Sequence, residues 1–128
     1  MDFKKLANQY RDELLDNVLP FWLEHSQDIE FGGYFSCLDR EGKVFDTDKF
    51  IWLQGREVWM FSMLYNKVEK RQEWLDCAVQ GGEFLKKYGH DGNYNWYFSL
   101  DRSGRPLVEP YNIFSYTFAT MAFGQLSL

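Results

Sequence analysis

The chain carries YFSCLDREGK at residues 34–43 and YFSLDRSGR at residues 97–105, two stretches that align with one residue skipped. Each joins a short apolar run to a turn that contains Gly, a pattern that predicts a β-hairpin. The repeat continues at an offset of 62 residues, so that Ile51 corresponds to Ile113 and Trp52 to Phe114. A repeat of one helical pair per roughly 60 residues is typical of a helical solenoid or a closed α/α toroid.

Helical periodicity surrounds both hairpins. Apolar residues recur at spacings of three and four in residues 3–25, 51–69 and 72–88, and a further helical stretch begins near Asn112. Pro20 should kink or loosen the last turns of the first stretch, and Gly89 occupies the position of a helix C-cap glycine. The predicted fold is therefore dominated by α-helices, in the order helix, hairpin, helix, repeated once.

Two such repeats cannot close a ring. We therefore expect residues 1–128 to be the N-terminal third of a longer barrel. The alternative is a small domain of four helices and two hairpins.

Composition narrows the class of protein. The 128 residues include 14 basic and 19 acidic side chains, a net charge of −5, which gives no support to nucleic-acid binding. No apolar run approaches the roughly 20 residues of a membrane span, and Cys37 and Cys77 form no disulfide framework, which favours a reducing cytoplasm. Aromatic residues make up 20% of the chain, which fits either a large core or a concave site for a sugar. Four of them stand at helical spacings and are predicted to belong to the core: Trp59, Phe61, Trp74 and Phe84.

Several blocks resemble the N-acylglucosamine 2-epimerase family. They are FWLEHS at 21–26, GGYFSCL at 32–38, WLQGREVWM at 52–60, GGEFL at 81–85, IFS at 113–115 and TMA at 120–122. WLQGR is the most specific block, and it looks closer to N-acylglucosamine epimerases than to cellobiose 2-epimerases. The resemblance implies an incomplete (α/α)6 barrel, with about two of the six helical pairs present.

The resemblance also implies a reaction. N-acylglucosamine and N-acylmannosamine would be interconverted by removing a proton from C2 of the open-chain sugar and returning it on the opposite face. Two histidines beyond this chain would be the acid and base. No cofactor would take part in the chemistry, ATP or another nucleotide would be an allosteric activator, and the protein would be a homodimer.

Three other functions stay open. One is a related aldose–ketose isomerase or cellobiose 2-epimerase. A second is a fragment of an (α/α)6 glycoside hydrolase, since such enzymes use paired carboxylates; the candidate acids, most of them at turn tips, are Asp39, Glu41, Asp46, Asp48, Asp101 and Glu109. A third is a sugar-binding module without chemistry.

Arg56 is the strongest candidate for a functional residue. It lies between Trp52 and Trp59 in an apolar helix start, where an arginine is costly unless it is paired or meets a ligand. A fixed cation would stabilise the negative charge that builds up when a proton is removed beside a carbonyl. The family resemblance places this arginine in the sugar pocket. The alternative is a structural ion pair, for example with Glu57.

Four further residues are candidate sugar ligands. Trp52 and its repeat partner Phe114 should reach the same rim of the barrel, and Tyr111 and Asn112 flank that junction, although Asn112 could simply cap the helix. His25 and His90 stand at the ends of elements, so we expect both to be solvent-exposed or to cap an element, and not to be the acid–base pair. Metal-binding spacings such as HExxH are absent from the sequence, so no metal site is predicted.

Overall fold

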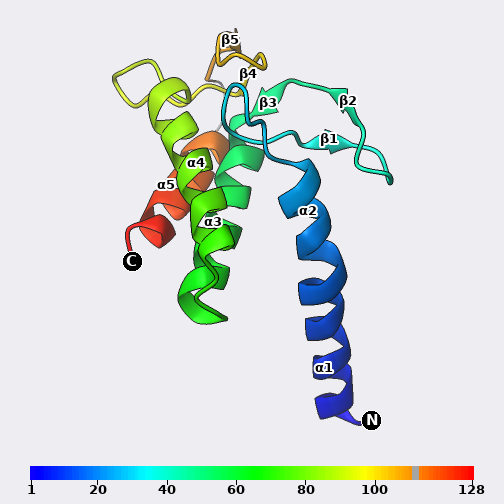
Figure 1. Ribbon diagram of the computed structural model, residues 1–128. Helices are drawn as coiled ribbons and strands as arrows, with labels where there is room; N and C mark the ends of the chain where they lie inside the picture. Colours follow the sequence, from blue (N-terminus) through cyan, green and yellow to red (C-terminus); the bar gives the residue numbers. More distant parts are fainter. Residues whose placement is uncertain (111–112) are drawn as a thin grey trace.

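The computed structural model describes residues 1–110 and 113–128, and most of them are helical (Figure 1). The helices are α1 (Phe3–Glu13), the π-helix η1 (Leu14–Val18), α2 (Leu19–His25), α3 (Ile51–Lys67), α4 (Gln72–Tyr88) and α5 (Phe114–Leu126). This confirms the helix-dominated fold that the periodicity predicts. None of these helices combines the length and apolar character needed to span a bilayer.

Two small antiparallel sheets accompany the helices. In one, β1 (Cys37–Leu38) pairs with β2 (Val44–Asp46), which is the first predicted hairpin. In the other, β4 (Ser99–Leu100) pairs with β5 (Pro106–Val108), the second predicted hairpin, and also with β3 (Lys49–Phe50). The strand β3 thus joins the two repeats, a pairing that the sequence does not predict.

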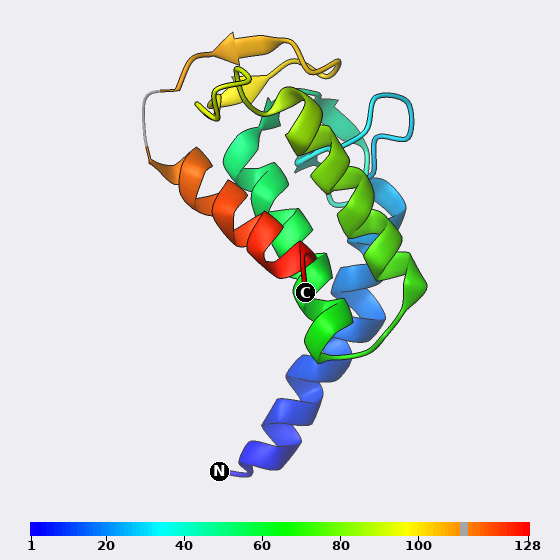
Figure 2. The ribbon, with the colours of Figure 1, turned by 90° about the vertical axis from the view of Figure 1, so that its left-hand side faces the viewer.

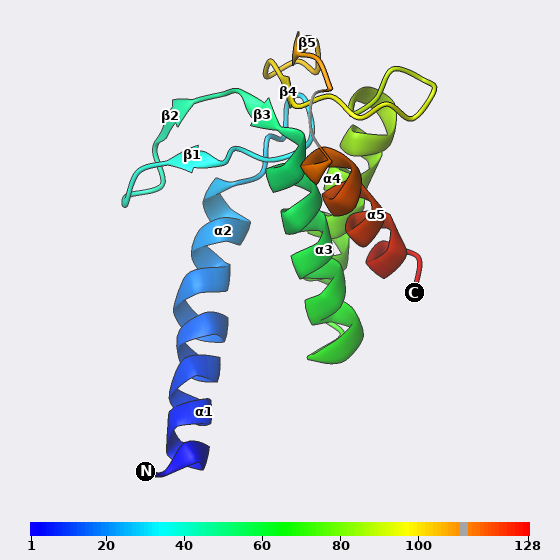
Figure 3. The same cartoon turned by 180° about the vertical axis from the view of Figure 1, so that it is seen from behind.

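Both hairpins lie at one end of the helices, as the repeat predicts (Figure 1, Figure 3). The helices α3 and α5 both start at this end, and α4 runs back toward it (Figure 2). Helix α3 packs against both α4 and α5. The starts of α3 and α5, which correspond in the repeat, are therefore neighbours.

The first helical stretch is a continuous rod, α1–η1–α2, whose π-turn lies directly before Pro20. The Leu19 N–H donates to the Leu14 carbonyl, five residues back. A proline lacks the N–H of a helical bond and its ring crowds the preceding turn, so the loosening predicted at Pro20 falls on its N-terminal side. The rod carries an exposed apolar stripe, formed by Phe3, Leu6, Tyr10, Leu14 and Val18.

The core lies where α3, α4 and α5 meet. Three of the aromatic residues expected there, Phe61, Trp74 and Phe84, are at most 3% exposed. Trp59, which the spacing also predicts to be core, is only partly buried. Helix α3 is apolar around most of its circumference, so periodicity alone does not identify which side faces the core.

Gly89 ends α4 as predicted, but with φ −70°, which is right-handed. Its lack of a side chain matters because of close packing, since a Cβ there would lie 2.7 Å from the Trp96 ring.

A buried cluster of charged side chains connects segments at the end of the molecule where the hairpins lie. Lys49 and Asp28 are fully buried, and Lys49 Nζ donates to Asp28 Oδ2 at 2.9 Å and to the Gly32 and Arg102 carbonyls. The Arg102 guanidinium also donates to both oxygens of Asp28. Burial would raise the pKa of Asp28, but the hydrogen bonds from Arg102 and Lys49 outweigh it and lower the pKa. The cluster therefore fixes β3, from which α3 begins, against the second hairpin.

Candidate functional site

An aromatic cavity opens where α3, α5 and the second hairpin meet. It has a volume of about 360 Å³, and it is lined by Trp52, Phe98, Phe114 and Phe118. Trp52 is the second residue of α3 and Phe114 is the first residue of α5. The repeat predicts that these two residues share a rim of the barrel, and in the structure both line this one cavity. Flat aromatic faces around an open space suit the C–H faces of a sugar ring.

Arg56 lies one turn along α3 from Trp52, beside two of the rings that line this cavity. Its guanidinium carbon is 5.8 Å from the centre of the Trp52 ring and 5.8 Å from that of the Phe118 ring. Arg56 is exposed, and within residues 1–110 and 113–128 no carboxylate forms an ion pair with it. Two cation–π contacts thus hold the side chain while its charge stays uncompensated.

The neighbouring carboxyl of Glu57 does not neutralise Arg56. Glu57 accepts a hydrogen bond from Ser26 Oγ, which lies on the α2 side of α3. Burial raises the pKa of Glu57 to about 8, against the opposing effect of that hydrogen bond. The carboxyl is therefore mostly neutral at pH 7, and the ion pair considered as an alternative role for Arg56 does not form with Glu57.

A second cavity, of about 180 Å³, lies between α2 and α3. Its lining residues are Val18, Trp22, Ser36, Leu53, Arg56, Glu57 and Met60. Arg56 therefore lines this second cavity. Its guanidinium also contacts Trp52 and Phe118, two of the rings that line the aromatic cavity.

Gln54 explains why α3 is held in one register. Its side-chain oxygen accepts from the Tyr34 N–H and its side-chain nitrogen donates to the Tyr34 carbonyl, each at 2.8 Å. The preceding Gly33 has φ +72°, and a Cβ there would lie 2.7 Å from Gln54 Oε1, so only glycine fits. The WLQGR block therefore combines a buried amide that anchors the helix with the exposed cation one turn further along.

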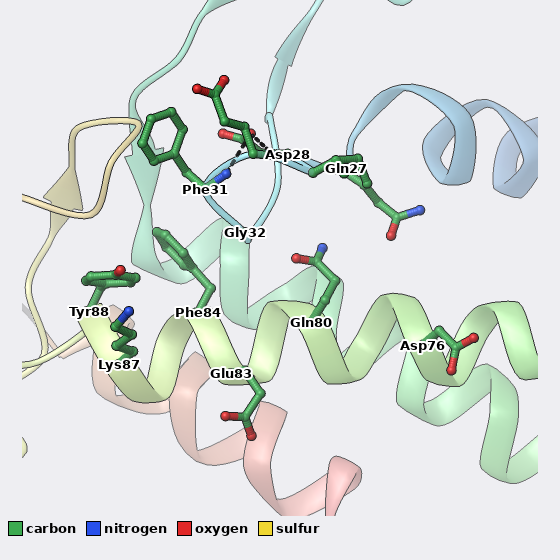
Figure 4. Close-up of a pocket in the computed structure, with 12 residues that line it drawn as sticks. Gln27, Asp28, Phe31, Gly32, Asp76, Gln80, Glu83, Phe84, Lys87 and Tyr88 are labelled. Atoms are coloured by element: carbon green, nitrogen blue, oxygen red, sulfur yellow. Dashed lines mark hydrogen bonds between the residues drawn. The ribbon is translucent and has the colours of Figure 1, made fainter.

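A larger cavity lies elsewhere, between α4 and the loop of residues 27–32 (Figure 4). It has a volume of about 710 Å³, and Trp52, Arg56 and Phe114, the predicted site residues that the structure describes, are not among its lining residues. Gln80 in its wall is engaged with the backbone of Gly33, and Asp28 accepts from the Phe31 N–H. These polar groups serve the fold, so the aromatic cavity is the better candidate for a ligand site.

The structure brings together three of the predicted site residues, Arg56, Trp52 and Phe114. The other two, Tyr111 and Asn112, lie outside the described residues. The sequence interpretation missed Phe98 and Phe118 as lining residues. The repeat contains the signal for Phe118, because it stands 62 residues after Arg56, the same offset that relates Trp52 to Phe114.

The two histidines of the chain are partly buried rather than solvent-exposed, and each packs against aromatic rings. The His25 ring packs against Phe21, with ring centres 4.9 Å apart. His90 Nδ1 accepts from the Gly92 N–H, and its ring contacts Tyr94 and Trp96. In the described part of the chain, no group of three or more His, Cys, Asp or Glu side chains is placed to hold a metal ion.

Three of the six carboxylates that suggest a glycosidase accept backbone N–H bonds in turns. Asp39 accepts from the N–H groups of Glu41 and Lys43, and Asp46 accepts from the N–H of Asp48. In the second hairpin Asp101 accepts from the Arg105 N–H in the same way. The paired hairpins thus use the same aspartate turn chemistry, which agrees with the turn interpretation of these residues.

The fold and the site together define a helix-dominated protein in which two hairpins lie at one end of the helices, with an aromatic cavity and an uncompensated arginine at that end. The sequence profile of the N-acylglucosamine 2-epimerase family matches residues 33–128. The chain therefore belongs to that family.

Similar proteins agree with this assignment. The chain is 48% identical over 119 residues to the N-acylglucosamine 2-epimerase of Mus musculus. The aligned region covers 90% of this chain and 28% of the mouse protein. The human N-acylglucosamine 2-epimerase is 47% identical over 116 residues. The structure of the cellobiose 2-epimerase from Bacillus thermoamylovorans B4167 superposes with a TM-score of 0.86 at 29% identity, covering 96% of this chain and 32% of that one. The chain thus spans less than a third of the length of these relatives.

Proposed function

We propose that the protein to which this chain belongs interconverts N-acylglucosamine and N-acylmannosamine at C2. In this proposal the chain supplies two of the six helical pairs of an (α/α)6 barrel, as its N-terminal third. The observation that carries the proposal is the uncompensated Arg56 guanidinium beside two rings of an aromatic cavity, Trp52 and Phe118, in a member of this family. The 47–48% identity to mammalian N-acylglucosamine 2-epimerases favours an N-acylated amino sugar over cellobiose.

The proposed mechanism moves one proton. A base removes the proton from C2 of the open-chain sugar. The electron pair of the broken C2–H bond forms a double bond between C1 and C2, and the π electrons of the C1 carbonyl move onto O1. The acid then returns a proton to C2 on the opposite face, so no atom is gained or lost. The family resemblance assigns the acid and base to histidines outside this chain. Our proposal for this chain is that Arg56 holds the negative charge on the sugar oxygen.

Two physical features suit Arg56 to this role. Its charge is already held in place by two rings, so it needs little rearrangement when negative charge develops. Its planar guanidinium can also donate two parallel hydrogen bonds to neighbouring oxygens, which an ammonium group cannot reproduce. Trp52 and Phe114 would face the apolar side of the sugar, and we retain Tyr111 and Asn112 as proposed ligands of its hydroxyl or acetamido groups.

The experiment uses the full-length protein with N-acetylmannosamine in heavy water. An epimerase incorporates deuterium at C2 of the product, whereas a glycosidase cleaves a bond without this exchange and a sugar-binding module does neither. Arg56→Ala should lower kcat about a hundred- to a thousandfold, corresponding to roughly 3–4 kcal/mol, and Arg56→Lys should recover only part of it. A folded Arg56→Ala enzyme with near-normal kcat would remove Arg56 from the mechanism.

Two further parts of the proposal rest on the family resemblance. We propose that the full-length protein is a homodimer and that ATP or another nucleotide activates it without taking part in the reaction. Sedimentation of the full-length protein tests the first. Measuring turnover with and without added nucleotide, while checking that the nucleotide is not consumed, tests the second.

A further inference from the structure

Phe118 is pressed against α3 at one point. A Cβ built on Gly55 would lie 2.8 Å from the Phe118 carbonyl oxygen and 3.1 Å from Phe118 Cβ. The absence of a side chain at Gly55 therefore lets α5 approach α3 closely at this level. Because the contact is made by backbone and Cβ atoms, it fixes where the Phe118 ring begins relative to α3.

The ring extends from this point into a cluster with Trp52 and Arg56. Its centre is 6.0 Å from that of the Trp52 ring, at an interplanar angle of 51°. The guanidinium carbon of Arg56 lies 5.8 Å from each ring centre. Trp52 and Arg56 are four residues apart on one helix and share a face, whereas Phe118 comes from the other repeat.

An exposed arginine normally moves among many rotamers. No carboxylate in the part of the chain that the structure describes forms an ion pair with Arg56, so the two rings are the contacts that restrict it. Trp52 alone would contact the guanidinium along one helix face. The second ring, from α5, limits movement away from that face toward the aromatic cavity.

We propose that Phe118 is a positioning residue for the epimerisation, whose ring holds the Arg56 guanidinium in place and whose own position is fixed by the contact at Gly55. This inference rests on the proposed role of Arg56. It predicts that losing the ring lowers turnover through Arg56, with little effect on how tightly substrate binds in the ground state.

The test is a double-mutant cycle in the full-length enzyme. Phe118→Leu keeps an apolar side chain but removes the ring, and it should lower kcat about five- to thirtyfold, the range expected for a partly desolvated cation–π contact. KM should change less than about threefold. Phe118→Tyr keeps the ring and should stay within about threefold of wild-type kcat. In the Arg56→Ala background, Phe118→Leu should cause no further loss.

Phe123→Leu is the matched control. Phe123 lies on the same helix and is partly buried, and its ring meets Trp96 with centres 5.9 Å apart. Its substitution should lower the melting temperature and leave kcat per folded molecule unchanged. If Phe118→Leu lowers the melting temperature by more than about 10 °C, Phe118→Met, which is unbranched and fills irregular space more easily, replaces it in the cycle.

The outcomes separate the two proposals. Full additivity of Phe118→Leu and Arg56→Ala, or a Phe118→Leu enzyme with wild-type kcat, would overturn the positioning role while leaving Arg56 catalytic. Equal losses in Phe118→Leu and Phe118→Tyr would also overturn it, because the ring would not be what matters. A wild-type kcat in Arg56→Ala would instead refute the proposed function itself.

Discussion

Asp28→Asn tests how the strand end that carries the site is held together. Asp28 is fully buried and accepts hydrogen bonds from Lys49 Nζ at 2.9 Å, from Arg102 Nε at 2.9 Å and from Arg102 Nη2 at 3.0 Å. The substitution keeps the shape and one acceptor oxygen but removes the negative charge. It leaves the fully buried Lys49 ammonium without its paired carboxylate and next to the partly exposed Arg102 guanidinium, which carries the same sign.

The expected cost is large because Lys49 cannot reach water. Breaking one partner of a buried ion pair typically costs about 3–5 kcal/mol. For a chain of this size such a loss lowers the melting temperature by about 10–20 °C. Arg102 should contribute less, since its side chain is 37% exposed and its charge can be hydrated when Asp28 is lost.

Thermal and denaturant unfolding of the 128-residue chain measures the effect. Asp12→Asn makes the same chemical change in the exposed pair with Arg11, whose side chains are 62% and 56% exposed, and it should cost less than about 1 kcal/mol. The double variant Asp28→Asn with Lys49→Met should lose less than the sum of the two single losses. An Asp28→Asn chain as stable as Asp12→Asn, or strictly additive losses, would refute the ion-pair argument.

Three further predictions concern other parts of the chain. Burial raises the pKa of Glu57 from 4.5 to about 8, so between these pH values the folded carboxyl keeps a proton that the unfolded one has lost. The free energy of unfolding should therefore fall as pH rises from about 5 to about 8. Glu57→Gln should abolish this pH dependence in unfolding experiments. The new methyl group in Gly81→Ala would overlap the Tyr34 side chain and should lower the free energy of unfolding by about 2 kcal/mol or more. In the control Gly124→Ala the methyl group meets no atom within 4 Å, so stability should be unchanged or slightly higher. Equal effects of the two substitutions would contradict this packing. The isolated chain, with its exposed apolar stripe along α1 and η1, should bind a hydrophobic dye and show little or no epimerase activity, and clear turnover by the purified monomer would contradict this.

The sequence by itself determined the local elements and their order. Spacings of three and four residues predict the helices, and aspartate–glycine turns predict both hairpins, because both signals depend on neighbours within a few residues. The 62-residue offset further places Trp52 and Phe114 at equivalent helix starts, which the shared cavity confirms. Arg56 stands out in the sequence because a charged residue interrupts an apolar helix face.

Only the tertiary structure decided which side chains meet across these elements. The pairing of β3 with β4, the cluster of Lys49 with Asp28 and Arg102, and the contact of Gly55 with Phe118 join residues 21 to 74 positions apart in the chain. Such contacts depend on how helices and loops pack in space, and no local periodicity records that packing. The same reason explains Glu57, whose neutral state at pH 7 follows from burial between α2 and α3, so the carboxyl beside Arg56 in the sequence does not neutralise it in the fold.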